Sequence, residues 1–340
     1  MELYKKYRPK IWNDVIGQDN IVEGLKKAVL DKKIPTAYAF FGGPGTGKTT
    51  CALILAKALN CDNLDSEGNP CNECHYCKAI DSKSQLGVDY ISMANNGSVE
   101  DVRKIVAEAR LAQPVKHQIK ILDEVQNLSS AAFDSLLIPL ESEQMKTLFI
   151  LCSTNPEKIK PAVLSRCQVR QFYPVDVKIL ANNLLKIAKQ ENLKVTKEQI
   201  ISAVKSANGS VRNSISNLET ILSTGSLPDT YSVKIIDALL TKQPENIFKL
   251  TKEMSSTGQN FVKATEYLYE ELSDILLHKG GVKVSTKTEE LSNKLTLTFV
   301  INSMDILGNA MNNMSNNVVD NKILLEVALT KILIKLKQNK

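Results

Sequence analysis

The sequence predicts an α/β fold with a parallel, five-stranded sheet, followed by a region that is built of helices alone. Residues 42–49, GGPGTGKT, match the phosphate-binding pattern G-x-x-x-x-G-K-T and stand between an apolar run of strand type and a run of helix formers. Strand and helix patterns then alternate as far as residue 173, whereas strand signals almost vanish after residue 175.

The composition is typical of a globular protein with two or three domains. The chain has 340 residues, 43% of them hydrophobic, and no apolar run approaches the roughly 18 residues that a membrane span requires. The first ten residues contain no apolar stretch of a signal peptide, so we expect a cytoplasmic protein without membrane contact. The net charge of +6 fits contact with nucleic acid, although a solvated basic surface explains it nearly as well.

The first part of the chain contains the strand signals and the helices between them. We expect the five strands at residues 37–41, 88–92, 118–123, 147–152 and 168–172. The run of helix formers after the phosphate-binding loop predicts a helix over 49–59, and Ser98 with Asp101 has the pattern of a capping box at the start of another. A serine at 129 or 130 is expected to cap a further helix, which continues through Glu141.

Amphipathic helices follow one another in the second part of the chain. They are expected at about residues 176–191, 196–207, 211–223, 231–240, 244–256, 261–278, 290–312 and 320–337, with a turn at 225–228. We therefore predict an α/β domain over 1–173 with an insertion at 61–84, a small helical domain over 174–241, and a larger helical domain over 242–340. The helix over 320–337 is apolar around most of its circumference, so it is either buried in its domain or faces another subunit.

The loop at residues 42–49 predicts nucleotide binding. Its glycines allow backbone N–H groups to turn inward around phosphate oxygens, and the following helix adds the positive end of its dipole. Lys48 is expected to reach the β- and γ-phosphates, and Thr49 to bind the Mg²⁺ that bridges them. A glycine-rich turn that matches by chance is the alternative, which the flanking strand and helix disfavour.

Three polar residues follow strands at the sheet edge where open α/β folds bind ligands. Asp123 and Glu124 end the third strand; Asp123 is expected in the Mg²⁺ shell, and Glu124 as the general base for the attacking water. Two acids at a strand end are often merely solvated, but their position one strand after a phosphate-binding loop favours the catalytic role. Thr154 follows the fourth strand, where it can hydrogen-bond the lytic water or the γ-phosphate.

Two arginines are candidates for stabilising charge on the γ-phosphate. Arg166 precedes the last strand and can act as an arginine finger, although an arginine beside a strand is more often a surface charge. Arg212 begins a helix of the small helical domain, from which it can approach the phosphate as a lid residue. The sequence leaves both alternatives open.

Four of the seven cysteines form a cluster in the sequence. Cys61, Cys71, Cys74 and Cys77 have the spacing C-x9-C-x2-C-x2-C, which predicts a closed, tetrahedral Zn²⁺ site with a structural role. His75 lies between two of them and is the substitute ligand to consider. Four free thiols that cluster by accident are the alternative.

Together these motifs resemble the gamma/tau subunits of bacterial DNA polymerase III, the ATPases of the sliding-clamp loader. The resemblance spans about residues 1–225 and rests on YRP at 7–9, VIGQ at 15–18, the phosphate-binding loop, the four cysteines, DEV at 123–125, STNP at 153–156 and LSRC at 164–167. It implies an AAA+ domain with a helical lid, a collar through which subunits oligomerise, and ATP hydrolysis at subunit interfaces.

The resemblance also implies roles for individual residues. Thr154 would be sensor 1, Arg212 sensor 2, and Arg166 would act in trans on ATP bound by a neighbouring subunit. The residues expected around ATP are Tyr7, Arg8, Val15, Ile16, Gly17, Gly43, Pro44, Gly45, Thr46, Gly47, Lys48, Thr49 and Thr50, the first five of them near the adenine.

The resemblance further implies cofactors and partners. The cofactors are ATP, Mg²⁺ and Zn²⁺. The partners are other clamp-loader subunits and copies of this chain in a ring, the sliding clamp, primed double-stranded DNA and the DNA polymerase III core, whose polymerase activity is not in this chain.

The sequence departs from the pattern of the family at a few positions. Pro44 stands where a charged residue is usual, Gln126 where His is usual, and Pro139 is expected to kink its helix or to end it early. Two other functions stay open. One is a scaffold subunit of the loader that uses no nucleotide, against which the intact Lys48 and Glu124 argue. The other is a different AAA+ motor, for branch migration or initiation, against which the four cysteines argue.

Overall fold

The computed structural model describes residues 2–82, 87–111, 115–142, 146–224, 230–256, 260–282, 286–315 and 320–338. The turn expected at 225–228 and the last two residues of the insertion at 61–84 lie outside these ranges. The chain divides into two compact units, residues 1–225 and 226–340. Each unit is described by itself.

The first unit contains the predicted sheet, in which all five strands are parallel. Its strands are β1 (Ala37–Phe41), β2 (Val88–Ser92), β3 (Gln118–Asp123), β4 (Thr147–Ser153) and β5 (Gln168–Gln171), in the spatial order β2-β3-β4-β1-β5. The register pairs Phe41 of β1 with Ser153 of β4, so these strands end level with each other. The phosphate-binding loop, Asp123 and Thr154 therefore leave the sheet at one edge.

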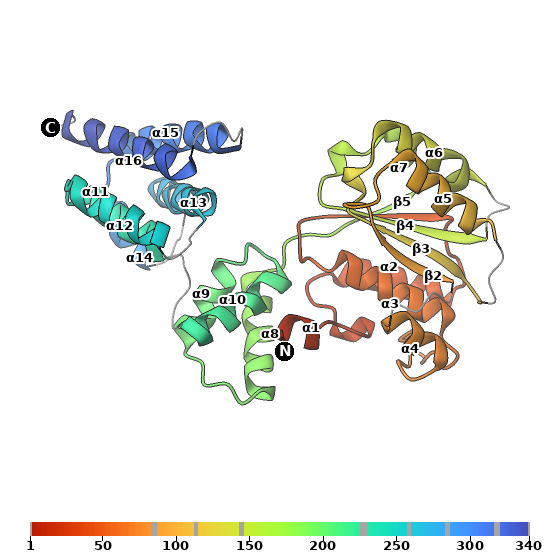
Figure 1. Cartoon of the computed structure of the whole chain (residues 1–340). Coiled ribbons are helices and arrows are strands. Elements are labelled where there is room, and N and C mark those ends of the chain that lie inside the picture. The colour runs from red at the N-terminus through yellow and green to blue at the C-terminus, as the bar shows by residue number, and fades with distance from the viewer. Residues whose placement is uncertain are drawn as a thin grey trace. The chain divides into compact units, whose positions relative to one another are not determined.

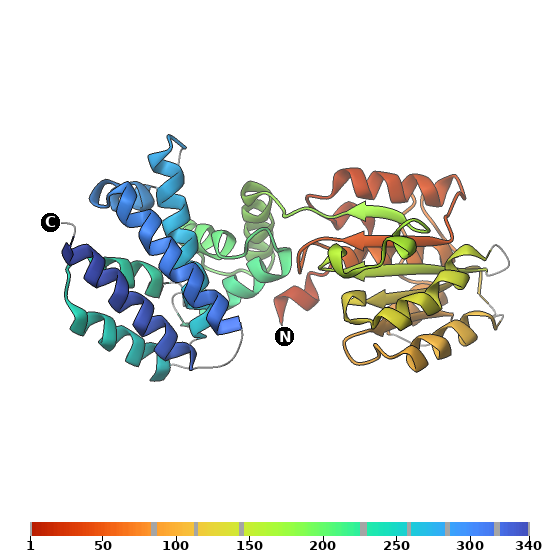
Figure 2. The same ribbon diagram turned by 90° about the horizontal axis from the view of Figure 1, so that it is seen from above.

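Both faces of the sheet are covered by helices, because alternate side chains of the strands enter two separate cores. In β1, Tyr38 and Phe40 pack in one core with α2 (Asp19–Leu30) and α3 (Lys48–Asn60), whereas Ala39 and Phe41 pack in the other with α5 (Val99–Ala109) and α6 (Ser130–Glu141). Figure 1 shows α2 and α3 on one face and α5 and α6 on the other, and the view from above in Figure 2 agrees. This burial on both faces explains why β1 and β4 read as nearly continuous apolar runs.

The helices of the first unit surround the sheet and then form a small group of their own. They are α1 (Leu3–Lys6), η1 (Trp12–Asp14), α2 (Asp19–Leu30), α3 (Lys48–Asn60), α4 (His75–Asp81), α5 (Val99–Ala109), η2 (Val125–Asn127), α6 (Ser130–Glu141), η3 (Pro156–Lys158), α7 (Pro161–Leu164), α8 (Val177–Gln190), α9 (Lys197–Lys205) and α10 (Val211–Thr224). Ser98 and Asp101 form the predicted capping box of α5, and Ser129 caps α6.

Pro139 does not end its helix early. The α-helix α6 continues past it to Glu141, as the apolar periodicity predicts. Pro139 lies in the last turn and is itself buried, so its ring packs in the core while only one backbone N–H of the helix is lost.

The second unit consists of helices around one apolar core (Figure 1). They are α11 (Thr230–Leu240), α12 (Pro244–Ser256), α13 (Phe261–Lys279), α14 (Thr286–Lys294), α15 (Leu297–Ser315) and α16 (Asn321–Gln338). The single helix predicted over 290–312 is wrong, since α14 and α15 are separate. Thr296 lies between them, and its hydroxyl accepts the backbone N–H of Phe299 at 3.2 Å, which caps the new helix.

The helix α11 packs with the second unit, in contrast to the predicted division at residue 241. Its Ile235, Ile236 and Leu239 are buried in the same core as Leu268 and Leu329. The two compact units meet between residues 225 and 226, and the division into the three named domains stays a prediction.

The last helix buries one side and exposes the other. Leu325 and Leu329 are fully buried, whereas Ile323, Val327 and Ile334 are about half exposed. The helix is therefore compatible with both predicted alternatives, burial in its own domain and contact with another subunit. Among the described residues, no helix is long and apolar enough to cross a membrane.

Candidate functional site

The phosphate-binding loop lies between β1 and the N-terminus of α3, and its shape depends on glycine. Gly42 has φ +146°, and a Cβ there would lie 2.4 Å from the backbone oxygen of Phe172. Gly45 has φ +73°, and a Cβ there would lie 2.1 Å from Oγ of Ser210. A residue with a Cβ would be strained at both positions, because of the positive φ and because of the neighbouring atoms.

Lys48 lies over this loop and is almost fully buried. Its ammonium group donates to the carbonyl oxygens of Gly42, at 2.6 Å, and Gly43, at 2.8 Å. Burial lowers the pKa of Lys48, while the carboxylates of Asp123 and Glu124 act in the opposite direction. The cation is therefore held at the mouth of the loop, close to the two acids.

Asp123 joins the loop to the end of β3. Its Oδ2 atom accepts hydrogen bonds from the hydroxyl of Thr49, at 2.9 Å, and from the hydroxyl of Tyr90, at 2.7 Å. Burial and the bond to Asp123 raise the pKa of Tyr90. A hydroxyl and a carboxylate this close provide the hard oxygen ligands that Mg²⁺ prefers, so the residues fit the ion.

Glu124 has an unusual backbone and a defined side-chain partner. Its φ of 60° and ψ of 40° are left-handed, a conformation that is sparsely populated by residues other than glycine, asparagine and aspartate. This turn directs the chain away from β3 into η2. The side-chain amide of Gln126, in η2, donates to the carboxylate of Glu124 and, at 3.0 Å, to the hydroxyl of Thr154.

A cleft of 490 Å³ lies beside the loop, between the N-terminal segment and the start of α10. Many of the residues expected around ATP line it: Tyr7, Arg8, Val15, Ile16, Gly45, Thr46, Gly47, Lys48, Thr49 and Thr50, together with Arg212. Gly17, Gly43 and Pro44 are not among its lining residues. Gly17 instead allows a close approach of Val175, whose Cγ1 would be 2.6 Å from a Cβ at that position.

Two residues at the start of the chain connect this cleft to other elements. The hydroxyl of Tyr7 donates to the carboxylate of Glu191, which follows α8 and also pairs with Lys6. The Nε atom of Arg8 donates to the hydroxyl of Thr50, at 3.2 Å. Burial lowers the pKa of Arg8, and the nearby Arg212 adds to this effect.

Gln18 is buried and bonds backbone groups of two separate segments, a role that the sequence did not reveal. Its Nε2 atom donates to the carbonyl oxygens of Tyr173, at 2.7 Å, and Thr46, at 3.3 Å, while its Oε1 atom accepts the N–H of Tyr173, at 3.3 Å. It thus ties the phosphate-binding loop to the segment after β5. The motif VIGQ contained this residue, but only the folded chain reveals which backbone groups it serves.

The helix α10 begins directly on the phosphate-binding loop. The backbone N–H of Val211 donates to the carbonyl oxygen of Gly45 at 3.0 Å. Cβ of Arg212 would lie 3.1 Å from a Cβ at Gly45, and its guanidinium lies over the ring of Tyr4, with 5.9 Å between Cζ and the ring centroid. Arg212 therefore lines the cleft as expected, and its role as sensor 2 stays a prediction.

Arg166 lies away from this cleft and is held by its own chain. Its guanidinium pairs with the carboxylate of Glu141 and donates to the carbonyl oxygen of Ala162 at 2.6 Å. Its side chain is 27% exposed. The structure thus shows an arginine tethered near the end of α6, and its action on a neighbouring subunit stays a prediction.

The four predicted cysteine ligands converge. The Sγ atoms of Cys61, Cys71, Cys74 and Cys77 lie within 4.8 Å of one another, and none of the four is in a disulfide. A tetrahedral Zn²⁺ with bonds of about 2.3 Å needs sulfurs about 3.8 Å apart, so the group fits zinc with little movement. His75 is not part of the group.

Backbone N–H groups favour the thiolate form of Cys71, the form that ligates a metal. Burial raises the pKa of Cys71 in part, but the N–H groups of Glu73 and Cys74, which point at its sulfur from 3.5 and 3.3 Å, help to lower it to about 6. The N–H of Cys71 donates in turn to the sulfur of Cys61 at 3.2 Å, but burial raises the pKa of Cys61 and that of Cys77.

The segment over residues 61–82, called the cysteine module below, contacts the N-terminal segment and α3. Trp12 is 1% exposed; its backbone N–H donates to Oδ1 of Asn69, at 3.0 Å, and its indole N–H to the carbonyl oxygen of Gly68, at 2.9 Å. Lys57 of α3 pairs with Asp81 of α4, with 3.1 Å between Nζ and Oδ1. The module therefore braces both the N-terminal segment and the helix after the phosphate-binding loop.

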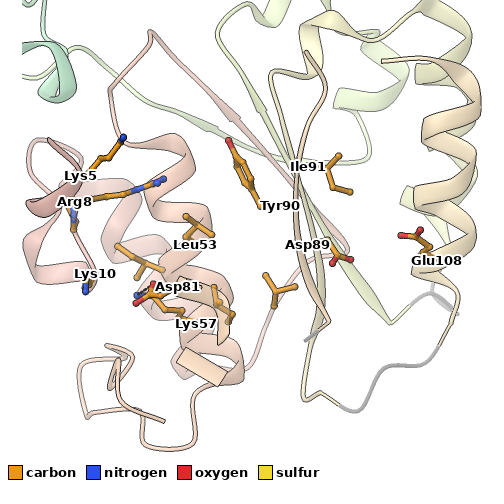
Figure 3. Close-up of a pocket in the computed structure, with 14 residues that line it drawn as sticks. Lys5, Arg8, Lys10, Leu53, Lys57, Asp81, Asp89, Tyr90, Ile91 and Glu108 are labelled. Atoms are coloured by element: carbon orange, nitrogen blue, oxygen red, sulfur yellow. Dashed lines mark ion pairs between the residues drawn. The ribbon is translucent and has the colours of Figure 1, made fainter. Parts of the chain in front are cut away.

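A second hollow, of 420 Å³, adjoins the first along the β2 edge of the sheet (Figure 3). Figure 3 shows Lys5 and Arg8 of the N-terminal segment on one side and Tyr90 of β2 across from them, with Lys57 and Asp81 at the other end. Lys5 and Arg8 also line the first cleft, so the two hollows share a wall.

Comparison with known proteins places the chain in a family. The family model described as "DNA polymerase III, delta subunit" matches residues 17–176. The DNA polymerase III subunit gamma of Buchnera aphidicola subsp. Baizongia pistaciae is 33% identical over 274 positions, which cover 76% of this chain and 74% of that protein. This chain belongs to the DNA polymerase III gamma/tau family.

Other members of the gamma/tau family are longer. The subunit tau of Bacillus subtilis is 32% identical over 97% of this chain, which covers 62% of that protein. The subunit gamma/tau of Mycoplasma pneumoniae is 32% identical over 78% of this chain, which covers 41% of that protein. The chain thus spans less than two thirds of the length of these two relatives.

Solved structures show weaker similarity. The Bacillus subtilis DNA clamp loader delta protein matches 91% of this chain and 98% of its own with a TM-score of 0.39 and 10% identity. The Thermotoga maritima RuvB Holliday junction branch migration motor matches 86% of each chain with a TM-score of 0.47 and 16% identity. Both TM-scores are below 0.5, so neither structure supports the assignment of the fold. That assignment depends on the strand order and the helices of this chain.

Proposed function

We propose that the chain is an ATPase subunit of the replicative clamp loader. It would bind and hydrolyse ATP, and thereby help to load the sliding clamp onto primed DNA within the DNA polymerase III holoenzyme. The observation that carries this proposal is the convergence of Lys48, Thr49, Asp123 and Glu124 at one sheet edge, in a chain of the gamma/tau family.

The loop supplies the binding site for the phosphates. The carbonyl groups of Gly42 and Gly43 accept from Lys48, and that of Gly43 also accepts from the hydroxyl of Thr46 at 2.8 Å. The N–H of Gly42 donates to the carbonyl oxygen of Ser153 at 3.3 Å, and the N–H groups that follow it in the loop would face the anion. Lys48 would exchange its carbonyl partners for phosphate oxygens, which bind a cation more strongly. Arg212 would add a second positive charge from α10.

Asp123 and Glu124 would have different roles in hydrolysis. Asp123 and Thr49 would hold Mg²⁺, which supplies charge neutralisation of the β- and γ-phosphates when it is bound. Glu124 would accept a proton from the attacking water, and Thr154 would contact that water or the γ-phosphate. Their positions at the ends of neighbouring strands β3 and β4 support these assignments.

The partners follow from the proposed complex. The second unit would form the collar that joins this chain to copies of itself and to other loader subunits, and the exposed apolar side of α16 supports such contacts. Arg166 would reach the ATP of a neighbouring subunit after it leaves Glu141. The polymerase core, the clamp and the primed DNA would be engaged by the assembled ring, in the cytoplasm.

The cysteine group would hold one structural Zn²⁺. All four ligand positions are taken by thiolate sulfur, which leaves no open position for catalysis. The ion would order the insertion at 61–82, from which Gly68 and Asn69 hold Trp12.

The test compares the 340-residue wild-type chain with two single-residue variants, whose fold is checked by thermal unfolding. Wild type should bind and hydrolyse ATP in the presence of Mg²⁺, and Lys48→Ala should lose hydrolysis because the cation over the phosphates is gone. Glu124→Gln should keep ATP affinity within about threefold and lose turnover by at least ~10²-fold, because an amide cannot accept the proton. Undiminished turnover by Lys48→Ala would refute the proposed function, and equal loss of binding and turnover in Glu124→Gln would show that Glu124 is structural.

A further inference from the structure

Gln126 lies between the two residues proposed to act on the γ-phosphate. Its side chain extends from η2, which follows β3, toward the end of β4. Its Nε2 atom donates to the carboxylate of Glu124 and to the hydroxyl of Thr154, at 3.0 Å. Its Oε1 atom accepts from the hydroxyl of Ser153, at 2.8 Å, and from the N–H of Thr154, at 3.3 Å.

These partners fix the orientation of the amide. A backbone N–H can only donate, so the amide atom that faces the N–H of Thr154 must be the oxygen. The NH₂ group then has to face Glu124, whose carboxylate can only accept when it is ionised. A flipped amide would set two donors against each other on one side and two acceptors on the other, so the network has one consistent arrangement.

The fixed amide determines which way the hydroxyl of Thr154 points. Because Gln126 donates to Oγ1 of Thr154, the hydroxyl proton is free to be donated elsewhere. A sensor residue needs this polarity, since the γ-phosphate offers only acceptors. In the same way one oxygen of Glu124 is held by the amide, and its second oxygen is left to accept a proton from water.

We propose that Gln126 is a positioning residue that couples the sensor Thr154 to the general base Glu124. This inference rests on the proposed ATPase function and extends it by one residue. When Thr154 contacts a bound γ-phosphate, the amide bonded to it holds one oxygen of Glu124, so that the base is aligned with the attacking water only when the triphosphate is present. Among the described residues, Gln126 alone bonds both Thr154 and Glu124.

A purely structural role for Gln126 makes different predictions. Its oxygen also ties η2 to the end of β4 through Ser153, which is a contact within the fold. Loss of a structural tie alone would lower the unfolding temperature and would leave kcat unchanged at temperatures where the variant is folded. Loss of positioning would instead lower kcat with little effect on ATP affinity.

Two substitutions separate these roles. Gln126→Leu has a similar volume and removes both donors, so kcat should fall about 10- to 100-fold while the Kd for ATP changes less than about threefold. Gln126→Glu keeps the oxygen that accepts hydrogen bonds from Ser153 and Thr154. This variant therefore retains the structural contacts even if the leucine variant does not fold. It replaces the NH₂ donor by an acceptor, so the bonds to Glu124 and to Oγ1 of Thr154 are lost while those from Ser153 and from the N–H of Thr154 are kept.

The comparison of kcat with ATP affinity is the decisive readout. For Gln126→Glu, kcat should fall about as far as for Gln126→Leu, because both variants lack the donor that joins Thr154 to Glu124, while the Kd for ATP changes less than about threefold. Asn127→Ala changes the next, exposed side chain of η2 and serves as the matched control, with wild-type kcat and Kd expected.

The experiment measures single-turnover and steady-state ATP hydrolysis by the 340-residue chain, alone and in its assembled complex. The double variant Gln126→Leu/Thr154→Val should lose no more activity than Thr154→Val alone, since both changes break one connection. The inference fails if Gln126→Leu retains kcat within about twofold, or if Gln126→Glu retains the kcat of wild type. Absence of hydrolysis by wild type and by Asn127→Ala would instead refute the proposed function itself.

Discussion

Replacing Gln18 by leucine should loosen the phosphate-binding loop and destabilise the first unit. Gln18 is 4% exposed and makes three hydrogen bonds to backbone groups, two with Tyr173 and one with Thr46. Leucine has nearly the same volume, so the substitution removes the polar contacts without opening a large cavity. The change therefore isolates the contribution of the hydrogen bonds.

The magnitude follows from the geometry of the three bonds. The 2.7 Å bond is of full strength, worth about 1 kcal/mol net, and the two 3.3 Å bonds are worth about half of that each, so their sum is about 2 kcal/mol. Tyr173 is largely exposed, and its backbone can bond to water instead, whereas Thr46 is buried and its carbonyl loses its partner. That orphaned acceptor adds about 1 kcal/mol, which gives a total loss of about 2–3 kcal/mol.

Thermal unfolding and nucleotide titration check this estimate. For a unit of this size, about 2–4 °C per kcal/mol applies, so the first unfolding transition should fall by about 4–12 °C. If the Thr46 contact accounts for about 1 kcal/mol of the loss, the affinity for ATP should fall about fivefold. Asn20→Leu makes the same kind of change at an exposed position two residues away and should shift neither quantity measurably. A shift below about 1 °C for Gln18→Leu, or one equal to that of the control, would refute the reasoning.

Three further predictions concern the arginine finger and the metal. Arg166→Ala should bind ATP normally yet hydrolyse it about 10³-fold more slowly in the assembled, DNA-stimulated complex. Mixing it with Lys48→Ala subunits, whose Arg166 is intact, should partly restore turnover. An undiminished rate in the complex would show that Arg166 is an ordinary surface charge. Glu141→Gln removes the ion pair of Arg166. Such partly exposed pairs are worth up to about 1 kcal/mol, so the rate of hydrolysis in the complex should rise by no more than about fivefold. A rate below wild type would indicate that Glu141 aligns Arg166 rather than restrains it. Cys74→Ser should lower the zinc content, measured on freshly purified reduced protein, well below one ion per chain while ATP binding persists, and wild-type protein that contains no zinc would overturn the assignment of the site.

Local sequence patterns predicted most of the architecture, because each pattern reflects a local requirement. The phosphate-binding loop needs glycines at positive φ, and the strands need apolar residues on both faces. The four cysteines were found by spacing, since two C-x-x-C steps place sulfurs at the distances a metal requires. The carboxyl-edge positions of Asp123 and Thr154 followed from the alternation of strands and helices alone.

The residues that the sequence did not reveal depend on contacts between distant segments. Tyr90 reaches Asp123 because β2 is the neighbour of β3, and strand order is not written in periodicity. Gln126 was noted only as a departure from the usual His, and its four hydrogen bonds join three residues at two different strand ends. The break at Thr296 was missed because the apolar residues on both sides keep nearly the same helical phase, and a single capping hydroxyl decides it.

The backbone carbonyls of the phosphate-binding loop explain why so many separate segments meet there. A buried carbonyl group requires a donor. The oxygens of Gly42 and Gly43 accept from Lys48, and that of Gly43 also accepts from the hydroxyl of Thr46. The oxygen of Gly45 accepts from the N–H of Val211 at the start of α10, and that of Thr46 from Gln18. These donors come from the loop itself, from α10 and from the N-terminal segment. A displacement of α10 or of the N-terminal segment must therefore either carry the loop with it or break one of these hydrogen bonds, which would couple such a displacement to the proposed phosphate site.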